Sequence, residues 1–320
     1  MATRDRGHYR MEIRRLGVHR SWRLPRLLKE LETRIQDDWR DNQLRGLDEF
    51  VGTVAPGAGA LGAASVSLLN FGLDQLRQAA LSSLASGRPQ SSSLALATSF
   101  LLRGFELEMF RLDLHYKEPR NAWGGFDNGA MLLAQMFSLG WISSAERTGG
   151  WFVASVLNGH YYDANPPYRN CAAWFVTRLF ADWRGSKVAR WPEHHYPAAI
   201  YDELRERWRT PDANQLVENL LAACDWHTHE CWKWSDQPKK HGDFTVDPYF
   251  GWPIEIHMIF RLRESLGLRN PDLDHPLMQT GLGAYRTATP VVTDPLLEAV
   301  TAKAVALYPQ LAERLTPLSE

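Results

Sequence analysis

The chain has 320 residues, of which 44% are hydrophobic and 23% are charged, and its formal net charge is −1. This is the composition of an ordinary globular protein that can bury a sizeable core. The near-neutral balance gives no reason to expect binding to nucleic acid or to a membrane surface. Three cysteines, Cys171, Cys224 and Cys231, are too few for a disulfide framework and fit a reducing compartment.

The first part of the chain contains two segments that bear on localisation. The arginine-rich N-terminus has no apolar segment after it, so it does not read as a secretory signal. The uncharged stretch from Phe50 to Leu73 is long enough for a membrane span, but it holds Pro56, Asn70 and several Gly and Ser. We interpret it as a loop over 51–60 that leads into a core helix, and we expect a soluble, cytoplasmic protein.

Helical periodicity dominates the first half of the sequence. Between Leu24 and Ile35, apolar residues recur at the spacing of one helical face. Two further helices are predicted over 61–85 and 94–114. The second of these is apolar on more than one side, which predicts a central position in the fold.

Glycines near residue 124 interrupt this pattern, and the second half is again helical. Helical segments are predicted over 129–142, 149–162, 169–185, 196–208, 212–234, 251–268 and 294–308. No apolar–polar alternation of the kind found in strands extends beyond five residues. The sequence therefore predicts an all-α fold of roughly nine to ten helices, packed as an irregular bundle or an α-solenoid-like stack without a significant sheet.

A soft boundary near 115–124 suggests two parts. We predict an N-terminal helical subdomain over 1–115 and a C-terminal helical subdomain over 116–320. One continuous domain is the alternative.

The stretch CDWHTHEC places two cysteines and two histidines within eight residues. On a helix, Cys224, His227 and Cys231 share one face, while His229 points away from it. Zinc-finger signatures pair close ligand spacings across a longer loop, and this stretch lacks that form. We interpret it as a buried helix face and assign no catalytic, cofactor-binding or metal-binding residue. A metal-dependent hydrolase that uses these three residues and His257 stays open as an alternative.

Glu255 lies on the apolar stripe of the helix expected over 251–268. A buried carboxylate is costly unless it is paired or hydrogen-bonded. It therefore needs a donor, for which Trp226, Trp252 and Arg178 are candidates. We interpret Glu255 as a buried structural node rather than as part of a binding surface.

The layout of residues 196–282 resembles the PoNi family, immunity proteins of polymorphic toxin systems that protect against PoNe-type nuclease toxins. The matching features are, in order, YPAAIYDELRERW, the helix NQLVENLLAACDWH, the polar stretch SDQPKKHGDFTVD, the entry YFGWPIE into a helix with Glu255 near its start, and NPDLDHPLM. Trp252 matches the family's aromatic residue after the glycine. Pro253 and His257 depart from its small and apolar residues.

This resemblance implies an all-α, cytoplasmic protein of a bacterium that carries a contact-dependent weapon such as a type VI secretion system. The protein would bind and neutralise a secreted antibacterial toxin, most of all a nuclease encoded by an adjacent gene. It would not be an enzyme and would need no cofactor, and its partner would be the toxin rather than nucleic acid or a membrane. Assembly into a homo-oligomer and a helical adaptor without a toxin remain open.

Toxins that cleave DNA present basic surface, so their inhibitors are expected to offer carboxylates among aromatic side chains. The candidate partner-binding residues are Asp225, Trp226, Glu230, Trp232, Trp234, Asp236, Asp243, Asp247 and Tyr249.

Overall fold

The computed structural model describes residues 15–35, 37–54, 57, 59–115, 125–161, 170–186, 188, 191, 199–231, 242–244 and 246–318. Within these ranges the chain forms eleven α-helices and four short 3-10 helices, and it contains no strand. The predicted all-α fold is confirmed, with slightly more helices than expected. None of the helices in the described part of the chain combines the length and the apolar character that crossing a membrane requires.

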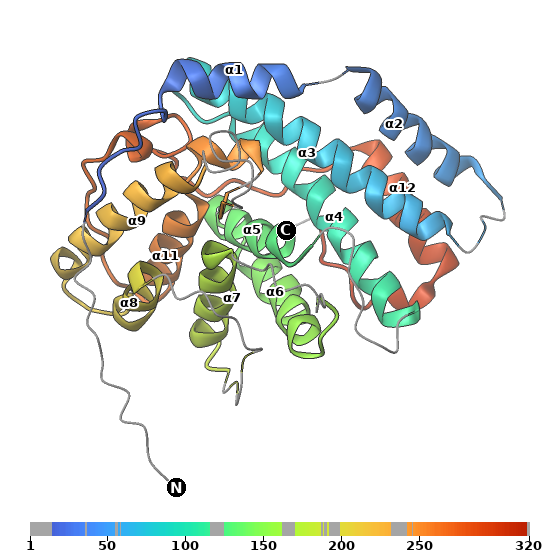
Figure 1. Ribbon diagram of the computed structural model, residues 1–320. Coiled ribbons are helices and arrows are strands. Elements are labelled where there is room, and N and C mark those ends of the chain that lie inside the picture. Colours follow the sequence, from blue (N-terminus) through green and yellow to red (C-terminus); the bar gives the residue numbers. More distant parts are fainter. Residues whose placement is uncertain are drawn as a thin grey trace, which may run out of the picture.

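Four helices form the first half of the molecule, and α3 and α4 are the longest (Figure 1). Their bounds are α1 (Leu24–Arg34), α2 (Asp37–Gly52), α3 (Ala60–Ser86) and α4 (Ser91–His115). The last two match the helices predicted over 61–85 and 94–114. The periodicity did not indicate α2, which begins where Ile35 turns to extended backbone and buries only Leu47 and Phe50.

The pairing of α3 with α4 depends on two glycines. A Cβ atom on Gly72 would lie 2.9 Å from the backbone nitrogen of Leu101, and one on Gly104 would lie 2.9 Å from that of Leu69. Such distances are shorter than carbon atoms tolerate, so only glycine permits this close approach.

Seven further α-helices and four 3-10 helices complete the fold. Their bounds are α5 (Gly125–Leu139), α6 (Ile142–Leu157), α7 (Cys171–Trp183), α8 (Ala199–Arg207), η1 (Ala213–Leu216), α9 (Val217–Glu230), η2 (Asp247–Gly251), α11 (Ile254–Ser265), η3 (Pro276–Gln279), α12 (Pro295–Leu307) and η4 (Pro309–Leu311). Helix α5 is central, because it packs against α4, α6, α7 and α11 and buries nearly every residue.

Two hydrophobic clusters form the core. The larger joins most of the helices from α1 to α11. The smaller joins α2, α3 and α4 to α12, with Leu47, Phe100 and Val300 among its fully buried members. Helix α12 thus packs against α2, although the two are far apart in the sequence. The boundary suggested near 115–124 lies outside the described residues except for its first residue, and the division into two subdomains stays a prediction.

Candidate functional site

The C-terminal half of α9 concentrates buried polar side chains. Asp225, His227, Thr228 and Glu230 are all at most 2% exposed, and α9 packs against α8, α11 and η3. Buried polar groups must find partners within the protein. Their partners therefore show which segments of the chain α9 holds in place.

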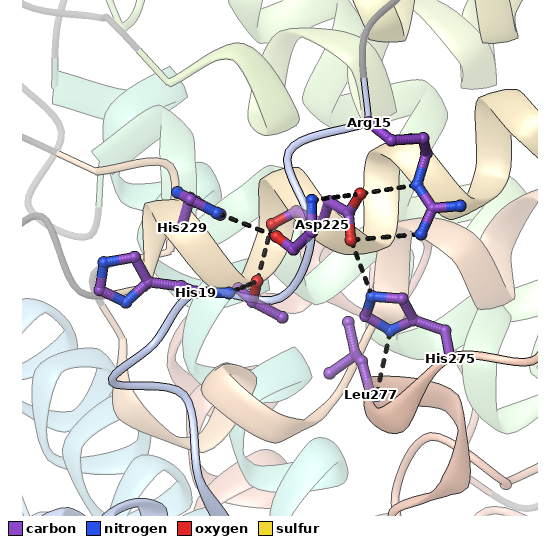
Figure 2. A network of polar contacts seen from close by, with 8 residues as sticks. Arg15, His19, Asp225, His229, His275 and Leu277 are labelled. Atoms are coloured by element: carbon purple, nitrogen blue, oxygen red, sulfur yellow. Dashed lines mark hydrogen bonds and ion pairs between the residues drawn. The ribbon is translucent and has the colours of Figure 1, made fainter.

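The carboxylate of Asp225 is held by a non-helical segment near the start of the chain, residues 15–22, which we term the N-terminal strap (Figure 2). Arg15 donates through Nε to Oδ2 at 2.6 Å and through Nη2 to Oδ1 at 3.4 Å. The backbone N–H of Gly17 donates to Oδ2 at 2.9 Å. The Asp225 side chain is fully buried, whereas that of Arg15 is 38% exposed.

His275 completes the ring of donors around this carboxylate. Its Nδ1 accepts the N–H of Leu277 at 3.1 Å, which caps η3. Its Nε2 therefore carries the hydrogen and donates to Oδ1 of Asp225 at 3.1 Å. Burial lowers the pKa of His275, against the pull of Asp225, so the imidazole is neutral.

The balance around Asp225 favours its charged form. Burial alone would raise the pKa of this carboxyl, but the donors from Arg15, Gly17 and His275 outweigh burial and lower it. Asp225 is therefore a carboxylate that binds a guanidinium inside the protein.

The backbone of the strap is also bound by α9. The N–H of His19 donates to Oγ1 of Thr228 at 2.9 Å, and Nε2 of His229 donates to the carbonyl oxygen of Gly17 at 3.0 Å. The rings of His19 and His229 meet edge to face, 4.8 Å apart. The strap thus lies along α9 through alternate residues.

Trp22 fastens the far end of the strap. Its indole is buried and donates to the carbonyl oxygen of Phe250 at 2.9 Å. Between the two ends, Leu16 and Val18 are 50% and 36% exposed. Their side chains therefore contribute little to holding the strap in place.

A second, fully buried pair lies on the other side of α9. Nδ1 of His227 lies 2.8 Å from Oε1 of Glu255, and Nε2 donates to the carbonyl oxygen of Tyr249 at 2.9 Å. Burial disfavours the charged imidazole, but Glu255 outweighs it and raises the pKa of His227 well above its usual value. His227 therefore stays protonated and donates through Nδ1 to Glu255.

The donor to Glu255 is thus not one of the three side chains considered from the sequence. Trp226 donates to Asp243, and Trp252 donates to Ser138. Arg178 lies 3.9 Å from Asp202. The donor is His227, which periodicity could not indicate because it does not reveal that α9 and α11 face each other here.

The arrangement of α9 gives the metal alternative no support. Both ring nitrogens of His227 already have partners. Burial raises the pKa of the thiols of Cys224 and Cys231, which keeps them protonated. In the described ranges, no group of three or more His, Cys, Asp or Glu side chains could hold a metal ion.

His257 belongs to a separate buried chain of hydrogen bonds. The Trp252 indole donates to Oγ of Ser138 at 3.0 Å, Ser138 donates to Nδ1 of His257 at 2.8 Å, and Nε2 donates to the carbonyl oxygen of Gly283 at 3.0 Å. Burial, with the positive charge of Arg286, lowers the pKa of His257 to about 3. A Ser–His contact can activate a nucleophile. Ser138 is 1% exposed and Trp252 is fully buried, so this contact satisfies polar groups within the core.

The other predicted partner-binding residues also turn inward. Asp243 accepts the N–H of Cys171 at 2.7 Å and the indole N–H of Trp226 at 2.8 Å. The N–H of Asp243 donates to Glu230 at 3.3 Å. These hydrogen bonds of Asp243 connect the start of α7 to α9.

Asp247 and Tyr249 belong to the core as well. Asp247 accepts from Arg77 at 2.9 Å and lies 3.6 Å from Arg34, which ties η2 to α1 and α3. The hydroxyl of Tyr249 donates to Gln135 at 2.6 Å. Each polar group in this set has an internal partner.

The structure therefore corrects the picture of an acidic contact surface. Asp225, Glu230, Asp243, Asp247 and Tyr249 are each at most 4% exposed. Trp226 is partly buried, and Trp232, Trp234 and Asp236 lie outside the described residues. Arg15 and His275, which the sequence did not indicate, donate the side-chain hydrogen bonds that keep Asp225 charged.

No protein-family model, no curated protein and no solved structure matches this chain.

Proposed function

We propose that this protein is a cytoplasmic immunity protein that binds and neutralises a secreted antibacterial toxin, most of all a nuclease effector of a type VI secretion system. The observation that carries the proposal is the arginine-binding carboxylate of Asp225, in the segment over 196–282 that resembles the PoNi family. In the structure this carboxylate is occupied by Arg15, whose guanidinium lies 2.6 Å away, so an arginine of the toxin would take the place of Arg15.

Arginine is the side chain that a nuclease offers most readily to an inhibitor. Nucleases bind phosphates through basic surface, and a guanidinium pairs with a carboxylate in the same two-donor geometry as with a phosphate. A buried carboxylate with positioned neighbours binds one arginine strongly, and such contacts dominate the affinity of interfaces. Neutralisation by binding requires no catalysis.

Growth and binding assays with the product of the adjacent gene test this proposal. We expect the two proteins to co-purify and this protein to rescue cells that express the toxin. Asp225→Asn is expected to weaken binding by about tenfold or more, because it removes the charge from the pair. The matched control is Glu298→Gln, an exposed carboxylate on α12, which should bind like the unaltered protein. Absence of both binding and rescue would refute the function.

A further inference from the structure

The strongest feature outside the core is the polar surface on which the N-terminal strap lies. It is formed by Asp225, Thr228, His229 and His275, which we term the cradle (Figure 2). We propose that the strap is an exchangeable occupant of the cradle, and that an extended segment of a basic partner, with an arginine two residues before a glycine, binds there in its place.

Apart from the edge-to-face contact between the rings of His19 and His229, the cradle binds four polar groups of the strap. It binds the guanidinium of Arg15, the N–H and carbonyl oxygen of Gly17, and the N–H of His19. Three of these four groups belong to the backbone and are present in any protein. Leu16 and Val18 face solvent to a large extent. An unrelated segment with the same backbone shape would therefore satisfy most of these groups if it supplied the arginine.

The glycine is the second requirement. Gly17 has a φ of 71°, in the left-handed region that side chains disfavour. This turn brings its N–H to Asp225 while its carbonyl oxygen reaches His229. The preferred partner sequence is therefore Arg-x-Gly.

The cradle keeps its shape without the strap. His275 is oriented by the N–H of Leu277, and the hydroxyl of Thr228 donates to the carbonyl oxygen of Asp225 at 2.8 Å. These contacts lie within α9 and η3. The contacts that orient Thr228 and His275 thus remain when residues 15–20 leave, while Trp22 stays in the core.

Departure of the strap creates a demand for another arginine. Asp225 would then keep only His275 as a side-chain donor and would lack a cationic partner, so its carboxylate would favour an incoming guanidinium. Arg15 itself is already 38% exposed, so it can return to water at low cost. An incoming guanidinium restores the pair that the departing one leaves.

This inference concerns any partner with the stated sequence feature. Where that partner is the proposed toxin, it rests on the proposed function and names the element of the toxin that is recognised. The strap then limits binding by competition, since it is tethered to the cradle at high effective concentration.

A peptide with the sequence of residues 15–20, RLGVHR, tests the exchange without any toxin. Its binding to the full chain is measured by fluorescence anisotropy, with Arg15→Ala as the variant whose own strap is weakened. We expect the variant to bind the peptide about tenfold more tightly than the unaltered chain does, because the competing occupant is lost. A peptide with alanine for its arginine should not bind, and one with alanine for its glycine should bind more weakly.

Failure of a folded Arg15→Ala protein to bind the peptide would overturn the proposal, as would equal binding of the peptide that lacks arginine. If Arg15→Ala does not fold, the unaltered chain serves instead. Excess peptide should then accelerate hydrogen exchange at the amide of Gly17, and unchanged exchange would overturn the proposal. Because no toxin is present, these outcomes leave the growth assay to judge the proposed function separately.

Discussion

Two buried carboxylates each accept a backbone N–H from a residue near one end of the chain, far away in the sequence. Asp225 accepts from Gly17 at 2.9 Å across 208 positions, and Glu106 accepts from Thr316 at 3.0 Å across 210 positions. The two contacts look alike, but they differ in where the arginine comes from.

In the C-terminal contact the arginine belongs to the body of the protein. Arg103 precedes Glu106 by one turn of α4, lies 2.8 Å from it and is 3% exposed. Arg103 also donates to the carbonyl oxygen of Thr316, and Thr148 donates to Glu106. We term these four residues the C-terminal latch. Its ion pair survives if the C-terminal segment detaches.

In the N-terminal contact the arginine belongs to the strap itself. When the strap detaches, Arg15 leaves with it and Asp225 loses its cationic partner. The comparison indicates two roles. An ion pair that is buried within one helix stabilises the fold, whereas a pair whose arginine lies on a terminal segment can exchange that arginine for one from a partner. Four experiments test this distinction.

The largest effect is expected from Glu106→Gln. The change places an amide NH2 group opposite a buried donor, either Arg103 or the N–H of Thr316, and it should lower the free energy of unfolding by about 2–3 kcal/mol, measured by urea denaturation. Glu108→Gln is the matched control, because its partner Arg111 is 21% exposed. A loss below about 1 kcal/mol for Glu106→Gln would remove the distinction between the two contacts.

Asp225→Asn should have a smaller effect on stability, about 1–2 kcal/mol, because Arg15 can return to water. The same urea measurement applies, with the exposed Asp272→Asn as the control that should change little. If Asp225→Asn destabilises the protein as strongly as Glu106→Gln does, the strap is as integral to the fold as the C-terminal latch.

Acidification should weaken the N-terminal contact at Gly17 but not the C-terminal contact at Thr316. Burial lowers the pKa of His275, so its contribution to holding the strap is present above about pH 6.5 and is lost as pH falls below it. Burial raises the pKa of Glu106, so acid does not weaken the C-terminal latch. We expect hydrogen-exchange protection at Gly17, corrected for intrinsic rates, to fall several-fold from about pH 7.5 to about pH 5, and protection at Thr316 to persist.

A variant checks the origin of that pH dependence. His275→Asn keeps a side-chain acceptor at the cap of η3 but cannot titrate in this range. It should flatten the response of the Gly17 amide. The same fall in protection in this variant would show that His275 is not the origin of the pH dependence.

Salt should have the smallest effect. Arg15 is partly exposed, so raising the ionic strength from about 0.1 M to about 1 M should reduce protection of the Gly17 amide by roughly two- to threefold. The pair of Arg103 and Glu106 is shielded from solvent, so the Thr316 amide should not respond. Equal responses at the two amides would contradict the assignment of the N-terminal ion pair as solvent-exposed and of the C-terminal ion pair as shielded from solvent.

Much of the fold could be predicted from periodicity. The helices expected over 61–85 and 94–114 appear as α3 and α4. Cys224, His227 and Cys231 are buried as predicted, with Cys231 at the C-terminal cap of α9. Helix α2 gave only a weak signal, because its face buries two large residues amid a polar sequence.

The candidate site was harder to predict, because the role of a charged residue depends on a partner that periodicity does not identify. Asp225 was expected to bind a basic partner, and the arginine that it contacts lies 210 positions away in the same chain. Asp247 likewise finds Arg77 across 170 positions. Local spacing distinguishes the faces of a helix, but it does not show which distant segment covers each face.

The most direct test of the central claim is native-state hydrogen exchange at the amides of Gly17 and Thr316 in the full chain, followed through low concentrations of urea. If the strap opens while the body stays folded, exchange at Gly17 has a small urea dependence and an opening free energy several kcal/mol below that of global unfolding. Exchange at Thr316 then approaches the global value. The same opening free energy and the same urea slope at both amides would contradict the claim that the N-terminal strap is an exchangeable occupant of the cradle.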